Sequence, residues 1–83
     1  MPIQIKSIEA LKKEANHGAE FFIRLQGCLR SSKYIDWDEE ARLFVIWNYI
    51  DDTEQELSEK QLMDRDCTNI GYAMTKGALF KDD

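Results

Sequence analysis

The hydrophobic residues of this chain follow two spacings, one typical of helices and one typical of strands. Ile8, Leu11 and Ala15 recur at intervals of three and four residues, so they share one face of a helix. Ser7 precedes them and can accept a hydrogen bond from the first helical turn, while Gly18 stands where the helix would stop. We therefore expect a first helix over residues 8–17, preceded by a short extended segment.

From Ala19 onward the hydrophobic spacing changes to two, which is the period of a strand. Four stretches have this alternation or are rich in β-branched and aromatic residues, and we expect strands at about 19–26, 33–38, 43–50 and 53–57. The pair Asp51-Asp52 is a candidate two-residue turn between the third and fourth strands, although the commoner pair has glycine second.

Two further short helices are expected in the last third of the chain. Ser58 and Gln61 have the spacing of a capping box, which predicts a helix to about residue 65. Thr68 or Asn69 can cap a last helix, which Gly77 would end before residues 78–80 return to the core.

These elements predict a single α+β domain over residues 1–83, with the order α-β-β-β-β-α-α. Four consecutive strands with short connections favour an antiparallel meander. Because a sheet must bury one hydrophobic face, we expect the short helices to pack together on that face.

Loop lengths predict which residues lie side by side on neighbouring strands. A four-residue loop at 39–42, a five-residue loop at 27–31 and the two-residue turn give these pairs: Trp37 with Phe44, Ile35 with Ile46, Leu25 with Lys33, Ile23 with Ile35, and Ile46 with Leu57. All three lengths agree on one core face, formed by Phe21, Ile23, Leu25, Ile35, Trp37, Phe44, Ile46, Ile50 and Leu57.

The opposite face of the predicted sheet is richer in aromatic residues than a solvated face would be. Contiguous apolar side chains with a polar rim are typical of an interface, and tryptophan and tyrosine are favoured there. The candidate protein-interaction residues on this face are Tyr34, Asp36, Val45, Trp47, Tyr49, Glu54 and Glu56. Three arrangements remain open: the terminal segments 1–6 and 78–83 cover the face, a second copy binds it, or a different protein binds it.

Negative charge is concentrated in one part of the chain. Nine carboxylates and one cation, Arg42, fall between Asp36 and Glu59, so this block carries about −8 while the whole chain carries −5. Such a one-sided field selects partners with a basic surface. It also argues against direct nucleic-acid binding, which requires clustered lysine and arginine.

The chain contains no recognisable catalytic, cofactor or metal motif. A surface or capping role is expected for His17, the single histidine, and the four glycines are isolated rather than arranged in a phosphate loop. Cys28 and Cys67 match no metal spacing, so we expect free thiols in a cytoplasmic protein. The longest apolar run, residues 43–47, is far too short to span a membrane.

Several segments carry a resemblance to a known group of proteins. These are SSKYI at 31–35, NYIDDTEQEL at 48–57, TNIG at 68–71 and KGAL at 76–79. The chain resembles, over roughly residues 20–80, small acidic phage- and prophage-encoded proteins of unknown function. The resemblance implies a bacterial or phage cytoplasmic setting, in which small acidic proteins often bind host proteins.

The expected function is that of a small acidic protein-interaction module, a modulator or inhibitor of a host protein with a basic surface. The alternative is a structural or accessory homodimer with no heterologous partner, in which Arg24 and Lys33 of one copy reach the acids of another. No enzymatic activity, cofactor or bound metal is expected.

Overall fold

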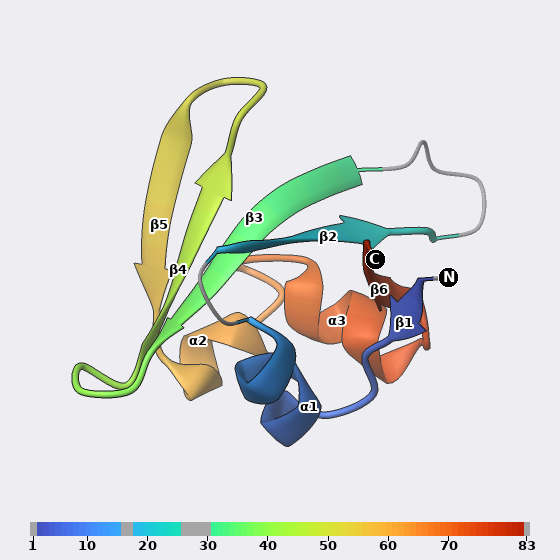
Figure 1. Ribbon diagram of the computed structural model, residues 1–83, viewed down its shortest axis with the longest axis horizontal. Coiled ribbons are helices and arrows are strands. Elements are labelled where there is room, and N and C mark those ends of the chain that lie inside the picture. Colours follow the sequence, from blue (N-terminus) through green and yellow to red (C-terminus); the bar gives the residue numbers. More distant parts are fainter. Residues whose placement is uncertain (1, 16–17, 26–30, 83) are drawn as a thin grey trace.

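A computed structural model describes residues 2–15, 18–25 and 31–82 of the chain, and shows an α+β fold (Figure 1). Within this part of the chain, six strands form one sheet and three short helices accompany it. In chain order the elements are β1 Ile3–Gln4, α1 Ile8–Glu14, β2 Ala19–Ile23, β3 Ser31–Asp38, β4 Leu43–Asn48, β5 Thr53–Leu57, α2 Glu59–Leu62, α3 Ile70–Thr75 and β6 Leu79–Lys81.

The sheet has the strand order β1-β6-β2-β3-β4-β5, and all neighbouring strands are antiparallel. The expected meander is present as β2 to β5, but the predicted number of four strands is wrong, because the sheet of the described residues has six. Both terminal segments add strands beyond β2, because Phe80 of β6 pairs with Phe22 and Gln4 of β1 pairs with Phe80. The element order is therefore β-α-β-β-β-β-α-α-β.

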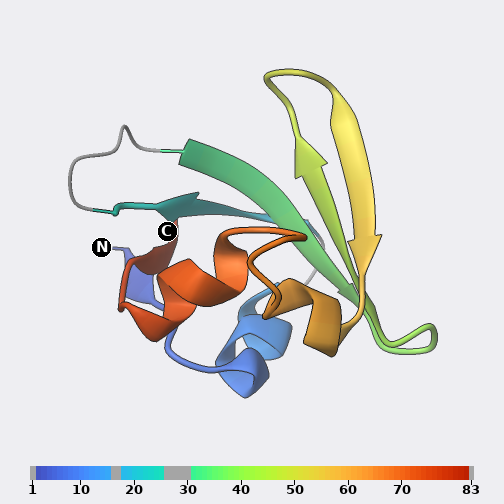
Figure 2. The ribbon, with the colours of Figure 1, turned by 180° about the vertical axis from the view of Figure 1, so that it is seen from behind.

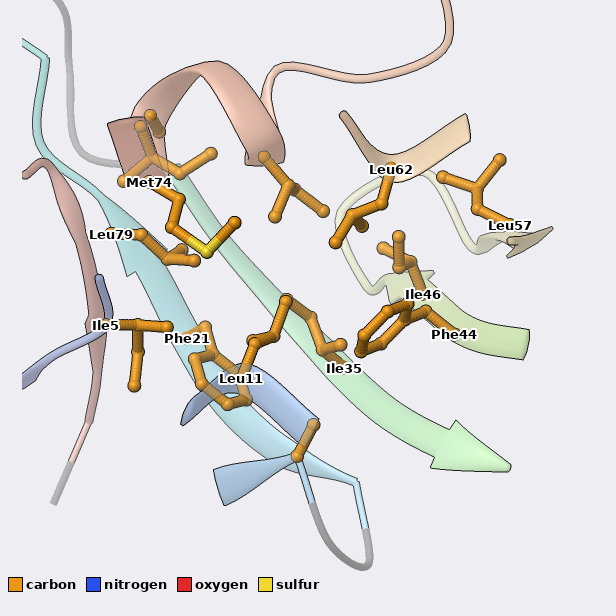
Figure 3. Close-up of a cluster of buried hydrophobic side chains, with 14 of the residues drawn as sticks. Ile5, Leu11, Phe21, Ile35, Phe44, Ile46, Leu57, Leu62, Met74 and Leu79 are labelled. Carbon is orange, nitrogen blue, oxygen red and sulfur yellow. The ribbon is translucent and has the colours of Figure 1, made fainter. Parts of the chain in front are cut away.

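All three helices lie on the same side of the sheet, as expected (Figures 1 and 2). Their hydrophobic side chains meet those of the sheet in one core (Figure 3). Phe21, Ile35 and Phe44 are buried there, together with Leu11 of α1 and Leu62 of α2. Burial of this apolar surface is the main favourable contribution to folding.

The predicted helix starts are confirmed by the caps. The Ser7 hydroxyl accepts a hydrogen bond from the Ala10 N–H at 3.1 Å. At α2, Ser58 and Gln61 exchange both hydrogen bonds of a capping box. Asn69 occupies the cap position of α3 without a side-chain bond, and the Thr68 hydroxyl accepts from the Ile70 N–H instead.

The register between β3 and β4 is as predicted, with Trp37 opposite Phe44 and Ile35 opposite Ile46. The register predicted between β4 and β5 is wrong by two residues, since Leu57 lies opposite Phe44 rather than Ile46. Residues 49–52 form a four-residue connection instead of a two-residue turn. Ile50 consequently lies outside the strand and is 77% exposed, so its assignment to the core is also wrong.

The register between β2 and β3 differs from the prediction by four residues. Ile35 lies opposite Ala19 rather than Ile23, because the connection after β2 is longer than five residues. The shift is even, so every side chain keeps its predicted face. It nevertheless changes the neighbour of Tyr34: the expected register would place Arg24 there, whereas Glu20 occupies that position.

One ionic cluster joins α1, α2 and the β3–β4 connection. Lys12 forms an ion pair with Glu59, and Arg42 approaches the same carboxylate at 3.5 Å. Both cations also lie over the Trp37 ring, at 4.8 Å for the Lys12 ammonium and 5.8 Å for the Arg42 guanidinium. Trp37 is thereby held at the margin of the core, against Phe44.

Candidate protein-interaction site

The outer face of β3, β4 and β5 brings together most of the candidate residues named from the sequence. Tyr34 lies opposite Trp47, and Asp36 lies opposite Val45. On the other side of β4, Glu54 and Glu56 lie opposite Trp47 and Val45 respectively. Because side chains on paired positions point to the same face, these six form one patch.

Tyr49, the seventh candidate, lies just beyond the end of β4 but still joins the patch through its ring. Its ring centroid is 5.7 Å from that of Tyr34 and 6.3 Å from that of Trp47. The Tyr34 and Trp47 rings are 5.4 Å apart. These separations are typical of favourable aromatic contacts, so the three rings form one cluster. We call it the outer aromatic cluster.

The outer aromatic cluster is open to solvent. Trp47 is 39% exposed and Tyr49 is 43% exposed, which is high for side chains of this size. The Trp47 indole N–H donates a hydrogen bond to Asp52 Oδ1 at 3.0 Å, which fixes the orientation of the ring. The sequence predicts a turn at Asp52 but gives no sign of this contact with Trp47.

A shallow hollow of about 250 Å³ lies beside the cluster. Its lining consists of Gly18, Tyr34, Asp36, Val45, Trp47 and Glu54. Five of these six were candidate residues from the sequence, and Gly18 was named only as the end of the first helix. Glu56 lies next to Val45 but does not line the hollow.

Carboxylates surround this patch, and the described part of the chain places no cation among the residues that line it. Asp36 and Glu54 belong to the hollow, and Glu20 lies opposite Tyr34 on β2. Glu20 is a functional candidate that the sequence missed, because the shorter expected loop would have put Arg24 beside Tyr34. Arg24 lies instead four residues further along, beyond the end of β2.

The terminal segments do not cover the outer aromatic cluster in the described residues. β6 pairs along β2 and β1 pairs along β6, so both extend the sheet sideways (Figure 1). Phe80 of β6 stacks on Phe22 of β2 at 5.4 Å between ring centroids, on the other side of β3 from β4 and β5. The alternative in which the described termini fold over the patch is therefore wrong.

Other chemical groups of the described residues offer little beyond this patch. No group of three or more histidine, cysteine or acidic side chains among them could hold a metal ion. Cys67 carries a free thiol between α2 and α3, and burial, with Asp64 and Asp66 nearby, raises its pKa, which disfavours the reactive thiolate. His17 and Cys28 lie outside the described residues, so the predictions for them stay predictions.

No described helix is both long enough and apolar enough to cross a membrane. Comparison with protein families, curated proteins and solved structures found no match to this chain.

Proposed function

We propose that this protein is a small interaction module that binds a basic surface of another protein through the outer aromatic cluster and its surrounding carboxylates. The observation that carries the proposal is the open cluster of Tyr34, Trp47 and Tyr49 on a sheet face that no described element covers. Binding rather than catalysis is the role that such a surface fits.

The aromatic rings supply the apolar part of the proposed interface. Tryptophan and tyrosine bury a large area with few rotatable bonds, so they lose little conformational entropy on binding. Contacts among the three rings, together with the Trp47–Asp52 hydrogen bond, restrain these side chains before a partner arrives. Such preorganisation reduces the cost of association.

The carboxylates supply the charge that selects the partner. Glu20, Asp36, Glu54 and Glu56 lie on the same face as the rings, by strand register. A partner with lysine or arginine opposite these groups would be attracted at a distance and correctly oriented. Because the carboxylates are exposed or half-buried, the attraction should weaken with added salt.

Self-association through the same face is less favourable. A symmetric dimer would bring these carboxylates against their own copies, which is repulsive. The homodimer hypothesis relied on Arg24 and Lys33 to relieve that repulsion. Glu20 rather than Arg24 adjoins the patch, and Lys33 lies opposite Phe21, which places it on the core side of the sheet. The charges on the face therefore favour a foreign basic partner.

The biological setting remains part of the proposal. A phage- or prophage-type protein in a bacterial cytoplasm would use this face to modulate or inhibit a host protein with a basic surface.

The acids on the exposed edge strand β5 favour contact through the face of the sheet, since charged side chains on an edge discourage pairing with another strand.

A charge-reversal experiment tests the proposal. The wild-type protein and the Glu54→Lys/Glu56→Lys double variant are used to capture proteins from bacterial lysate at low and high salt. We expect the wild type to retain a basic protein at low salt, and the double variant and Trp47→Ser to lose it. Sedimentation over a range of concentrations should show all three as monomers.

Glu40→Lys/Asp66→Lys is the matched control, because it makes the same change in net charge at two exposed carboxylates away from the outer aromatic cluster, one on the β3–β4 connection and one between α2 and α3. This control should keep most of the binding. An equal loss of binding in both double variants would show that binding depends on net charge alone and not on the outer aromatic face. A wild-type dimer that Trp47→Ser disrupts, without any captured partner, would support the homodimer instead.

A further inference from the structure

A second and larger hollow lies where the end of β2, the C-terminal end of α3 and the start of β6 meet. Its volume is about 850 Å³, within the size range of small-molecule sites in proteins. The residues that line it are Arg24, Leu25, Arg65, Tyr72, Lys76, Gly77, Ala78 and Phe80. We call it the basic hollow. The proposed protein-binding face uses none of these residues.

The charge of the basic hollow is opposite to that of the protein as a whole. Arg24, Arg65 and Lys76 contribute three positive charges, and none of the described residues that line the hollow is acidic. The chain carries 16 acidic residues against 11 lysines and arginines, so carboxylate partners are plentiful. Lys12 and Lys81 have such partners, whereas none of the three cations of the hollow forms an ion pair within the described residues.

Tyr72 organises two of these cations. The Arg65 guanidinium lies 3.9 Å from the centre of the Tyr72 ring, and the Lys76 ammonium lies 5.6 Å from it. A guanidinium that contacts an aromatic ring through its face keeps the N–H groups of its edge free to donate. Edge donors of this kind bind phosphate or carboxylate oxygens in pairs.

The backbone around the basic hollow is fixed by hydrogen bonds. The Arg24 N–H donates to the Ala78 carbonyl at 2.9 Å, so the end of β2 is held against the chain that follows α3. Gly77 has a φ of +69°, and its carbonyl accepts a hydrogen bond from the Gln4 side chain at 2.8 Å. The cations therefore project from a scaffold that exists before any ligand binds.

We propose that the basic hollow binds a small organic phosphate carrying two or more negative charges. Arg24, Arg65 and Lys76 would hold the phosphate oxygens, while Leu25, Ala78 and Phe80 would contact the organic part. A small ligand fits better than a nucleic acid strand, because a strand continuing past the hollow would meet the surface of a protein with a net charge of −5.

Titration followed by NMR and calorimetry tests this proposal with ADP, pyrophosphate, inorganic phosphate and adenosine. We expect ADP and pyrophosphate to bind with one-to-one stoichiometry and to shift the amide signals of Arg24, Lys76 and Gly77. Inorganic phosphate should compete weakly, and adenosine should shift these signals little. Arg24→Gln and Lys76→Gln should each raise the Kd for ADP about tenfold, as expected for the loss of one charged contact.

Lys60→Gln is the matched control, since it removes one positive charge from the exposed face of α2, away from the hollow. It should leave the Kd unchanged, and a folded amide spectrum for every variant excludes loss of structure as the cause. Absence of shifts from ADP, pyrophosphate and phosphate at about 1 mM would overturn the proposal. Equal weakening by Lys60→Gln, or tighter binding of an oligonucleotide than of ADP, would also overturn it.

Discussion

At the scale of single residues, two isoleucines in one hydrophobic run have opposite environments. Ile46 and Ile50 share the strand parity that would put both on the core face, yet Ile46 is 3% exposed and Ile50 is 77% exposed. The β4–β5 hairpin extends beyond the helices that cover the rest of the sheet (Figures 1 and 2). Burial on this face therefore depends on the position of the helices as well as on strand parity.

Truncation of these two residues should have different effects on stability. Ile46→Ala leaves a cavity in the packed core and should lower the free energy of unfolding by about 2–4 kcal/mol. Ile50→Ala removes the same atoms from solvent and should change it by less than about 0.5 kcal/mol. Urea unfolding of both variants measures the difference. Equal losses of unfolding free energy would show that the Ile50 side chain is buried, contrary to its exposed position in the β4–β5 connection.

For the residues of the candidate site, the sequence predicts the face of the sheet but not every neighbour on the adjacent strand. Parity along a strand was enough to place Tyr34, Asp36, Val45 and Trp47 on one face, because errors of two or four residues in register leave the face unchanged. Parity could not identify Glu20 as the neighbour of Tyr34. That pairing depends on the length of the connection after β2, which hydrophobic spacing does not reveal.

At the scale of elements, the connections that flank β4 have the same form. Each has four residues, follows Asp38 or Asn48 at the end of a strand, and ends in a residue with positive φ, 55° at Arg42 and 53° at Asp52. Asp38 and Asn48 each accept a hydrogen bond from the second connecting residue. Asn48 was therefore an available signal for the four-residue loop, since such side chains favour turns.

The terminal strands were harder to predict than these connections. β1 has two residues and β6 has three, too few to show a period of two over several positions. β6 pairs with β2 and β1 pairs with β6, and both pairings join distant parts of the chain. The helix starts were predictable because Ser7 and Ser58 act within one turn of their own position.

The contact between α2 and α3 requires glycine at position 71. A Cβ atom there would lie 2.5 Å from the Leu62 carbonyl oxygen and 2.6 Å from Met63 Cα, both of which are backbone atoms. Gly71→Ala should therefore lower the free energy of unfolding by about 1–3 kcal/mol despite the higher helix propensity of alanine.

Thermal or urea unfolding measures this loss, and a double-variant control identifies its cause. The Met63 sulfur would also lie close to the new Cβ, at 2.9 Å, but it belongs to a flexible side chain. Met63→Ala should thus fail to rescue Gly71→Ala. Full rescue would show that the side chain rather than the backbone creates the obstacle.

The ion pair between α1 and α2 should make stability depend on pH. The Lys12 ammonium, by hydrogen bonding to Glu59, lowers the pKa of that carboxyl below its ordinary value of 4.5. The stabilisation is therefore complete above pH 4.5 and is lost as the pH falls through the folded-state pKa. The same contact raises the pKa of Lys12 above 10.5, so the stabilisation is also lost when the pH rises through that higher value.

Urea unfolding across the acid range tests this dependence. Glu59→Gln should reduce stability at neutral pH and flatten its decline below pH 4.5. Glu40→Gln removes an exposed carboxylate from the β3–β4 connection and serves as the control for loss of charge. An unchanged acid decline in Glu59→Gln would show that other groups are responsible for it.

At the scale of the whole molecule, charge divides the sheet into two regions. The outer aromatic cluster and its carboxylates lie towards β5, whereas Arg24 and the basic hollow lie towards β6. Composition indicated the acidic region, because its carboxylates are close together in sequence. The basic hollow gave no such signal, since its three cations come from positions 24, 65 and 76 and meet only in the fold.

Trp47 is exposed within a field of negative charge, and quenching of its fluorescence tests both properties together. In Trp37→Phe, Trp47 is the single tryptophan. We predict that acrylamide quenches it readily and that, at low salt, caesium quenches it better than iodide. Glu54→Lys/Glu56→Lys should abolish that preference, and salt should weaken it. Protection from all three quenchers would show that Trp47 is covered, and stronger quenching by iodide would show that its surroundings are not negative; either result would rule out an open acidic face.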